Sequence, residues 1–162
     1  MDWLGCDAGR GRMVDVVDSE ERLIGVIRGI FSNELEVRVS HEVVTVNWDG
    51  QSKSIRAVFQ VSAGAGRPRV IGVGECQSAE PSTVVPLFGP LPAGISSDTW
   101  EEGLNAFMQH LLSQALLGLV AIRPVVHLRG VRALGGLPIG EPGQMLVTAL
   151  LRANAFHCTV ED

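Results

Sequence analysis

Histidine has the widest chemical range of the side chains in this sequence, and three of the four histidines fall within or next to strand-like segments. If those strands joined one sheet, His41, His127 and His157 would be neighbours, and a metal site built from imidazoles is the chemistry that such a cluster could support. No pair of them has the spacing typical of zinc ligands. The same reasoning applies to His110, in a predicted helix. We therefore expect ordinary hydrogen-bonded histidines and no bound metal.

A second kind of chemistry, the binding of an anion, is suggested by Arg129 and Arg132, which follow a predicted strand and precede a predicted helix. Glycine-rich stretches occur at residues 64–66 and 135–136, but neither carries the full fingerprint of a phosphate-binding loop between a strand and a helix. A solvated loop over residues 129–143 is the simpler interpretation. A small regulatory module that binds a phosphorylated ligand or another anion at this loop is kept as the alternative.

Nucleophilic catalysis and two-metal catalysis are not indicated. Cys158 follows His157 directly, and adjacent residues of a strand point to opposite faces, so the two cannot act as a pair. The three cysteines share no close spacing, which fits reduced thiols better than a disulfide framework. A nuclease would need clustered carboxylates, and the first predicted strand offers Glu36 alone, with Val37 and Val39 pointing inward.

The composition is that of a soluble globular domain. Of 162 residues, 46% are hydrophobic and 19% are charged, which is too apolar for a disordered chain. The net charge of -5 and the absence of a run of Lys and Arg argue against nucleic acid as a partner. The N-terminus is acidic where a secretory signal would be basic, and the longest apolar run, at residues 111–122, is too short to span a bilayer. We expect a cytoplasmic protein in which residues 1–21, with six acidic side chains, form a flexible acidic leader.

The elements that must position these residues follow a clear order. They are a helix at residues 22–31, strands at 35–40, 42–48, 54–61 and 69–74, an extended piece at 83–88, a helix from 98, a strand at 124–128, a helix at 142–153 and a strand at 156–160. Asp49-Gly50 predicts a hairpin between the second and third strands, and Asp98 with Glu101 predicts a capping box. Three meandering strands followed by helix, strand, helix and strand predict one α/β domain. Its mixed five-stranded sheet with flanking helices is the layout of the ribonuclease-H-like fold.

One stretch resembles a known family. Residues 28–35, Arg-Gly-Ile-Phe-Ser-Asn-Glu-Leu, closely resemble the start of MreB-type bacterial actins (rod shape-determining proteins), where a short amphipathic helix runs through Arg-Gly-Met-Phe-Ser-Asn-Asp-Leu into the first strand. Looser likenesses follow in the family's order at residues 70–75, 107–111 and 160–162. The resemblance covers residues 22–162 and corresponds to the family's first large subdomain. It implies an actin-like ribonuclease-H-fold domain over this range.

The departures from that family concern its first phosphate loop. Where the family continues Ser-Ile-Asp-Leu-Gly-Thr, Arg38 stands at the position of the Asp that organises magnesium and its water, and a guanidinium would repel a metal. Ser40 replaces the Gly that lets the backbone approach phosphate, and His41 follows it. The chain also ends at Asp162, before the family's second subdomain. We expect that ATP hydrolysis is lost, and that the chain is not an enzyme and holds no cofactor.

The predicted helix at residues 22–31 presents an apolar face, for which the resemblance implies contact with lipid. This face consists of Leu23, Ile24, Ile27, Ile30 and Phe31. The segment has only two cations, Arg22 and Arg28, and the acidic leader beside it weakens attraction to anionic lipid. Packing against the domain or a protein partner is therefore favoured, and peripheral contact with the inner membrane face stays open.

These observations lead to one main hypothesis. The chain is a non-catalytic actin-like domain, a pseudo-ATPase that acts through contact with a protein partner or with itself. A cytoskeletal or cell-shape accessory is the role that fits the resemblance. The scaffold retained beside a disabled nucleotide site motivates this hypothesis.

Overall fold

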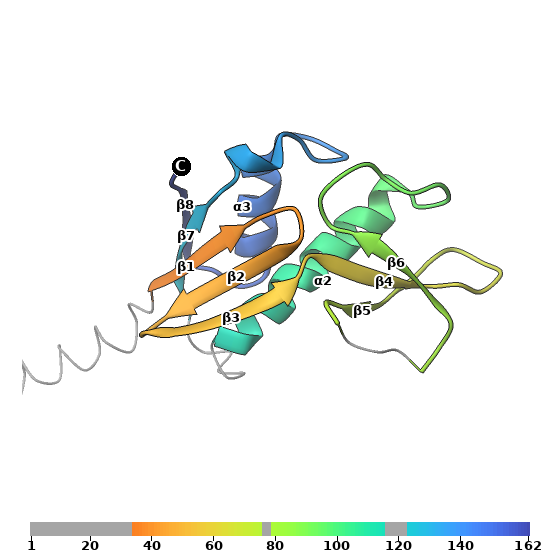
Figure 1. The fold of residues 1–162 in the computed structure, drawn as a ribbon, viewed down its shortest axis with the longest axis horizontal. Coiled ribbons are helices and arrows are strands. Elements are labelled where there is room, and N and C mark those ends of the chain that lie inside the picture. The colour runs from red at the N-terminus through yellow and green to blue at the C-terminus, as the bar shows by residue number, and fades with distance from the viewer. Residues whose placement is uncertain (1–33, 76–78, 116–122) are drawn as a thin grey trace, which may run out of the picture.

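The computed structural model of this chain describes residues 34–75, 79–115 and 123–162. Figure 1 shows their arrangement: a sheet with two long helices behind it and a second, smaller sheet beside it. The predicted leader at residues 1–21 and the predicted helix at residues 22–31 lie outside the described residues. In the part that is described, no helix combines the length and the apolar character needed to cross a membrane.

The first three strands form an antiparallel meander. They are β1 (Glu34–Val39), β2 (Val43–Trp48) and β3 (Gln51–Arg56). Between β2 and β3, Asp49 and Gly50 have φ angles of 43° and 74°, the pair of positive values that a type I′ hairpin requires. The predicted two-residue hairpin is therefore confirmed.

Two further strands extend this sheet in parallel. β7 (Val125–Arg129) pairs with β1, and β8 (His157–Val160) pairs with β7. The resulting order, β3-β2-β1-β7-β8, combines antiparallel and parallel pairs and confirms the predicted mixed five-stranded sheet. The parallel pairs require crossovers, because the chain must return to the same end of the sheet before each new strand. α2 (Ser97–Ala115) lies in the first crossover and α3 (Pro142–Arg152) in the second.

The prediction of one strand over residues 54–61 is wrong. At Ala57 the chain leaves the first sheet and enters a three-stranded antiparallel sheet of order β5-β4-β6. The Ala57 N–H donates to Glu42 O at 2.7 Å and its carbonyl accepts from Leu87 N at 2.8 Å, so this residue joins the two sheets. The alternation of apolar residues continues through Ala57 without a break. The sequence pattern therefore does not show that the pairing strands change at this residue. The strands of the second sheet are β4 (Val58–Ser62), β5 (Val70–Val73) and β6 (Ser82–Pro86).

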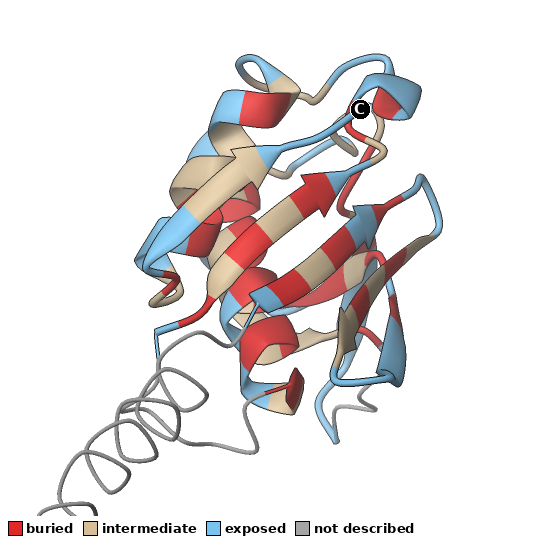
Figure 2. Ribbon diagram, turned by 90° about the vertical axis from the view of Figure 1, so that its left-hand side faces the viewer, coloured by how far each residue is buried: buried red, intermediate tan, exposed pale blue. Residues whose placement is uncertain are grey.

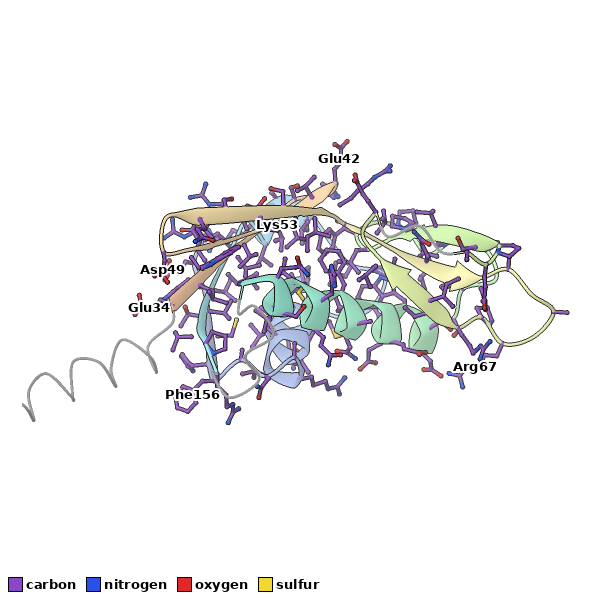
Figure 3. The ribbon with its side chains drawn as sticks, turned by 90° about the horizontal axis from the view of Figure 1, so that it is seen from below. Glu34, Glu42, Asp49, Lys53, Arg67 and Phe156 are labelled. Carbon is purple, nitrogen blue, oxygen red and sulfur yellow. The ribbon has the colours of Figure 1, made fainter. Side chains whose placement is uncertain are left out.

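The core lies on one face of the five-stranded sheet. Its residues from the five strands are Leu35, Val37, Val39, Val44, Val46, Ile55, Val126 and Leu128, all buried. In Figure 3, α2 and α3 both lie on the same side of this sheet, where they cover these side chains. The apolar stripe predicted for the long helix is buried from Trp100 to Ala115, and Leu119 lies outside the described residues.

The start of α2 differs from its prediction, whereas the start of α3 agrees. Ser96, rather than Asp98, caps α2, because the Ser96 Oγ accepts a hydrogen bond from the Thr99 N–H at 3.2 Å. A serine two residues upstream therefore takes the place of the predicted capping box. α3 begins at Pro142, and the carboxylate of Glu141 accepts hydrogen bonds from the two amide N–H groups that follow the proline.

Candidate functional site

The face of the five-stranded sheet opposite the helices is polar, and Figure 1 looks onto it. Glu36 lies opposite Asn47 on β2 and opposite His127 on β7. Arg38, two residues further along β1, lies opposite Arg129 at the end of β7. Opposed residues of neighbouring strands point to the same face, so these five side chains form one layer.

Glu36 is the centre of this layer. Its Oε1 accepts hydrogen bonds from Arg38 Nε at 2.7 Å and from Asn47 Nδ2 at 3.1 Å. Its Oε2 lies 3.3 Å from Arg129 Nε. The hydrogen bond from Arg38, helped by Asn47 and by the charge of Arg129, lowers the pKa of Glu36 below its ordinary value. Glu36 is therefore an ionised carboxylate with cationic partners on two strands.

A second carboxylate, Glu161, stands just beyond the end of β8. Its Oε2 accepts a hydrogen bond from Arg129 Nη2 at 2.8 Å, and its Oε1 lies 2.8 Å from His127 Nδ1. The hydrogen bond from Arg129, followed by that from His127, lowers the pKa of Glu161. An ionised carboxylate can only accept, so the proton of this contact is on Nδ1 of His127. The Thr159 Oγ1 lies 3.0 Å from the same nitrogen.

Arg129 thus bridges two carboxylates that come from different strands. The pairs Arg38–Glu36 and Arg129–Glu161 balance their formal charges, and His127 adds a hydrogen bond without requiring a further charge. We call Glu36, Arg38, His127, Arg129 and Glu161 the charged cluster. A divalent cation placed here would meet two guanidinium groups within the same set of contacts, which is unfavourable for metal binding.

Next to the charged cluster is an open hollow of about 890 Å³. It brings together the two sets of residues that the sequence singled out, since Arg38 and Ser40 line it together with Arg129 and Arg132. Arg132 Nε lies 3.4 Å from the carboxylate of Asp162, and its side chain is 85% exposed. The arginines of the hollow therefore have carboxylate neighbours.

Ser40 and His41 are occupied with local contacts. The Ser40 Oγ donates to Val43 O at 2.8 Å, which closes the turn between β1 and β2. The His41 Nε2 lies 3.2 Å from Ala133 O, so the ring faces the loop after β7 rather than the charged cluster. Ser40 thus lines the hollow, whereas His41 lines a different one, beside β3 and α2.

The histidines do not come together. His127 lies in the charged cluster, His157 is exposed on β8, His41 follows β1, and His110 lies on α2. Within residues 34–75, 79–115 and 123–162, no group of three or more His, Cys, Asp and Glu side chains could hold a metal ion. The arrangement offers hydrogen bonds and balanced charge.

Sequence reasoning missed the part that Glu36 and Glu161 play in this cluster. The alternation of β1 correctly predicts that Val37 and Val39 point inward, and it implies that Glu36 and Arg38 share the other face. The meeting of Glu36 with Glu161 through Arg129 depends on the register of β1 with β7 and of β7 with β8. The first of these registers joins residues 91 positions apart in the chain and the second joins residues 32 positions apart, and no local pattern encodes either.

Comparison with solved structures identifies the fold. The chain is similar to MreB5 of Spiroplasma citri bound to ADP, with a TM-score of 0.53 and 13% identity, over 81% of this chain and 38% of that one. It is also similar to a non-polymerising mutant of MamK bound to AMPPNP, with a TM-score of 0.53 and 15% identity, over 80% of this chain and 40% of that one. The matched part thus spans less than half the length of either protein.

These likenesses show that the chain has an actin-like fold of the ribonuclease-H-like type, as predicted. No protein-family model matches the sequence, and no curated protein matches it significantly. Membership of the MreB family stays a prediction, because identities this low establish the fold alone.

Proposed function

We propose that this chain is a non-catalytic actin-like domain that acts through protein–protein contact, as an accessory of a bacterial actin-type cytoskeleton or of cell shape. The observation that carries this proposal is the position and pairing of Arg38. The resemblance aligns Arg38 with a metal-organising Asp, and its guanidinium donates to Glu36 at 2.7 Å.

The electrostatics of the charged cluster support the loss of nucleotide chemistry. Magnesium bound to phosphates needs oxygen ligands with uncompensated negative charge. Here Glu36 and Glu161 each accept from an arginine, and Arg129 contacts both. Binding a metal would require breaking these contacts while two guanidinium groups stay nearby. Since the cluster does not favour nucleotide chemistry, we assign the function of this domain to contact with other proteins.

A test of the first half of the proposal is isothermal titration of the full chain with ATP and magnesium. We expect no heat of binding and no hydrolysis, because the cluster offers neither a metal site nor free cations. Micromolar affinity for the nucleotide would overturn the proposal. Sedimentation velocity over a range of protein concentrations, alone and with candidate filament proteins, tests the second half, and association is the expected result.

The alternative, a module that binds a phosphorylated ligand or another anion, is supported by the three arginines that line one hollow, Arg38, Arg129 and Arg132. An anion there would compete with carboxylates already in place, and for this reason we rank it second. A thermal-shift titration with inorganic phosphate separates the two functions. Stabilisation that is lost in Arg129→Ala and Arg132→Ala favours the module, and no response favours the protein-binding domain.

The place of action that we propose is the cytoplasm, with peripheral contact at the inner membrane face through residues 22–31 as an open part of the proposal. Co-sedimentation with anionic liposomes tests it. If the segment contacts lipid, Ile27→Asp and Phe31→Asp reduce the bound fraction, because each places a charge on the apolar face. Equal sedimentation of the variants and the wild type, or no sedimentation at all, argues against membrane contact.

A further inference from the structure

The outer edge of β8 carries an unusual set of exposed apolar side chains. β8 is the last strand of the order β3-β2-β1-β7-β8, so one of its sides has no strand partner within the described residues. Leu151, Phe156 and Val160 are 43%, 65% and 45% exposed, and they lie on α3, just before β8 and in β8. Figure 2 faces this side of the molecule, and Figure 3 places Phe156 on the helix side of the sheet. We call these three residues and β8 the β8 edge.

The opposite edge of the same sheet has a different character. β3 exposes Gln51, Lys53 and Arg56, and its one buried residue is Ile55. Charged side chains on an edge strand, lysine above all, discourage pairing with another chain. β8, with the sequence His-Cys-Thr-Val, has no Lys, Arg or Pro. One edge strand therefore carries cations and the other does not, although Arg123 stands beside the β8 edge, with its guanidinium carbon 5.8 Å from the centre of the Phe156 ring.

The backbone of β8 is arranged to accept a further strand. Glu161 N donates to Leu128 O on β7. Because peptide groups alternate in direction along a strand, those of residues 157 and 159 also face β7, whereas those of Cys158 and Val160 face away from the sheet. Their N–H and C=O groups can bond to a strand that is added at this edge, whereas the Phe156 N–H already donates to Pro124 O at 2.8 Å.

We propose that two copies of this chain pair through the β8 edge, as antiparallel strands related by a two-fold axis at Cys158. This inference rests on the proposed function, and it names a second copy as the partner. A two-fold pair needs a surface that is complementary to itself. With the axis at Cys158, Phe156 of one copy comes beside Val160 of the other, twice, so the two most exposed apolar side chains of the β8 edge cover one another.

The same register is also favoured by the polar side chains. It places His157 opposite Thr159, with no like charges facing each other across the pair. A register with its axis at Thr159 also uses the outward peptide groups, and it would place Phe156 beside Asp162. That carboxylate is already bonded to the Val131 N–H at 3.1 Å, so an apolar ring against it would gain little.

The test is sedimentation velocity of the full chain and of two matched variants. Val160→Asp puts a charge on the β8 edge, and Val84→Asp makes the same change at a 53% exposed valine of β6, which is an edge strand of the other sheet. We expect a dimer for the wild type and for Val84→Asp. For Val160→Asp we expect a dissociation constant raised about tenfold or more, because two charges enter an apolar contact. The thermal unfolding temperature of both variants should equal that of the wild type. A change in the dissociation constant then reports on pairing and not on loss of folding.

The register is tested in a Cys6→Ser/Cys76→Ser background, where Cys158 is the remaining thiol. Directly opposed residues of antiparallel strands have Cβ atoms about 4.5–5.5 Å apart, which a short cross-linker with two thiol-reactive ends can span. This reagent should therefore link two copies through Cys158, and Val160→Asp should prevent the link. Failure of the link in a dimer overturns the register.

The remaining outcomes separate this inference from the proposed function. A dimer that Val160→Asp leaves intact overturns the β8 edge as the interface but leaves association through another surface. A wild type that stays monomeric at every concentration, with no binding of ATP, overturns the self-pairing alone. A monomer that binds ATP and magnesium overturns both.

Discussion

Arg38 and Glu36 form an ion pair within a single strand, with Nε 2.7 Å from Oε1 and one residue between them. Both side chains lie on the open face of β1, because residues two apart in a strand point the same way. The positive charge at Arg38 is therefore matched on its own strand before any other element contributes. Arg129 then links this pair to the end of β8, so that three strands share one set of charges.

The charged cluster should make stability fall in acid. Glu36 and Glu161 both have a pKa lowered by hydrogen bonds from arginine, so folding favours their ionised forms. Their stabilising contribution is complete above the pKa of an unfolded glutamate, about 4.3, and is lost as the pH falls through the lower folded values. Denaturant unfolding of the wild type and of Glu36→Gln/Glu161→Gln should show a difference in free energy at pH 7 that shrinks in this acidic range. A difference that is constant with pH would contradict the assignment.

Gly130→Ala should destabilise the junction between β1 and β7. Gly130 has a φ of 83°, and a Cβ at this position would lie 2.5 Å from Val39 O, a backbone atom that cannot swing away. The left-handed conformation costs about 1–2 kcal/mol for alanine and the overlap about 1–3 kcal/mol, so we expect a loss of about 3 kcal/mol in the free energy of unfolding. Denaturant titration measures it.

Gly135→Ala is the matched control for this change. Gly135 has a φ of 67°, but a Cβ there would have open space around it. It should lose only the conformational part, about 1–2 kcal/mol. Equal losses in the two variants would mean that the loop after β7 moves away from Val39 without cost.

How far the sequence predicts this protein is illustrated by Ala57. Local patterns predict the hairpin at Asp49-Gly50, the helix that starts at Pro142 and the alternation of β1, because each depends on neighbours in the chain. The break at Ala57 depends on which strands pair on either side of it, and the buried face continues through it unchanged. Pairing is a property of the assembled sheet, so the second sheet could not be predicted as a separate unit.

For the candidate site, too, local patterns predict some features, whereas others depend on how the strands pair. Arg38, Ser40, Arg129 and Arg132 could be singled out by type and position, and the structure brings them around one hollow. Their carboxylate partners could not be assigned, since these contacts require the parallel register that aligns β1, β7 and β8. The exposure of Phe156 could not be predicted from the sequence either, because an apolar residue at the start of a strand is ordinarily expected to be buried.

Gly103→Ala should loosen the packing of the second sheet on α2. A Cβ on Gly103 would lie 2.6 Å from the ring of Phe59, which is fully buried on β4. Alanine is favoured over glycine in a helix by about 1 kcal/mol, but overpacking against a buried ring costs about 1–3 kcal/mol, so a net loss of stability is expected. Gly64→Ala, with open space around its Cβ, should be close to neutral. A Gly103 variant more stable than the wild type would show that the ring yields easily.

Cys158 should be a slow thiol in the folded protein. Partial burial against the core raises its pKa from 9.0 to about 11. Since the thiolate is the reactive form, the Cys6→Ser/Cys76→Ser variant should react with a disulfide reagent at pH 8 roughly a hundredfold more slowly when folded than when unfolded in denaturant. The rate for the folded protein should keep rising up to about pH 11, the pKa that burial gives Cys158. A plateau near pH 9 would mean that the thiol is solvated, and that the packing of β8 against α3 is looser than the contacts of Cys158 imply.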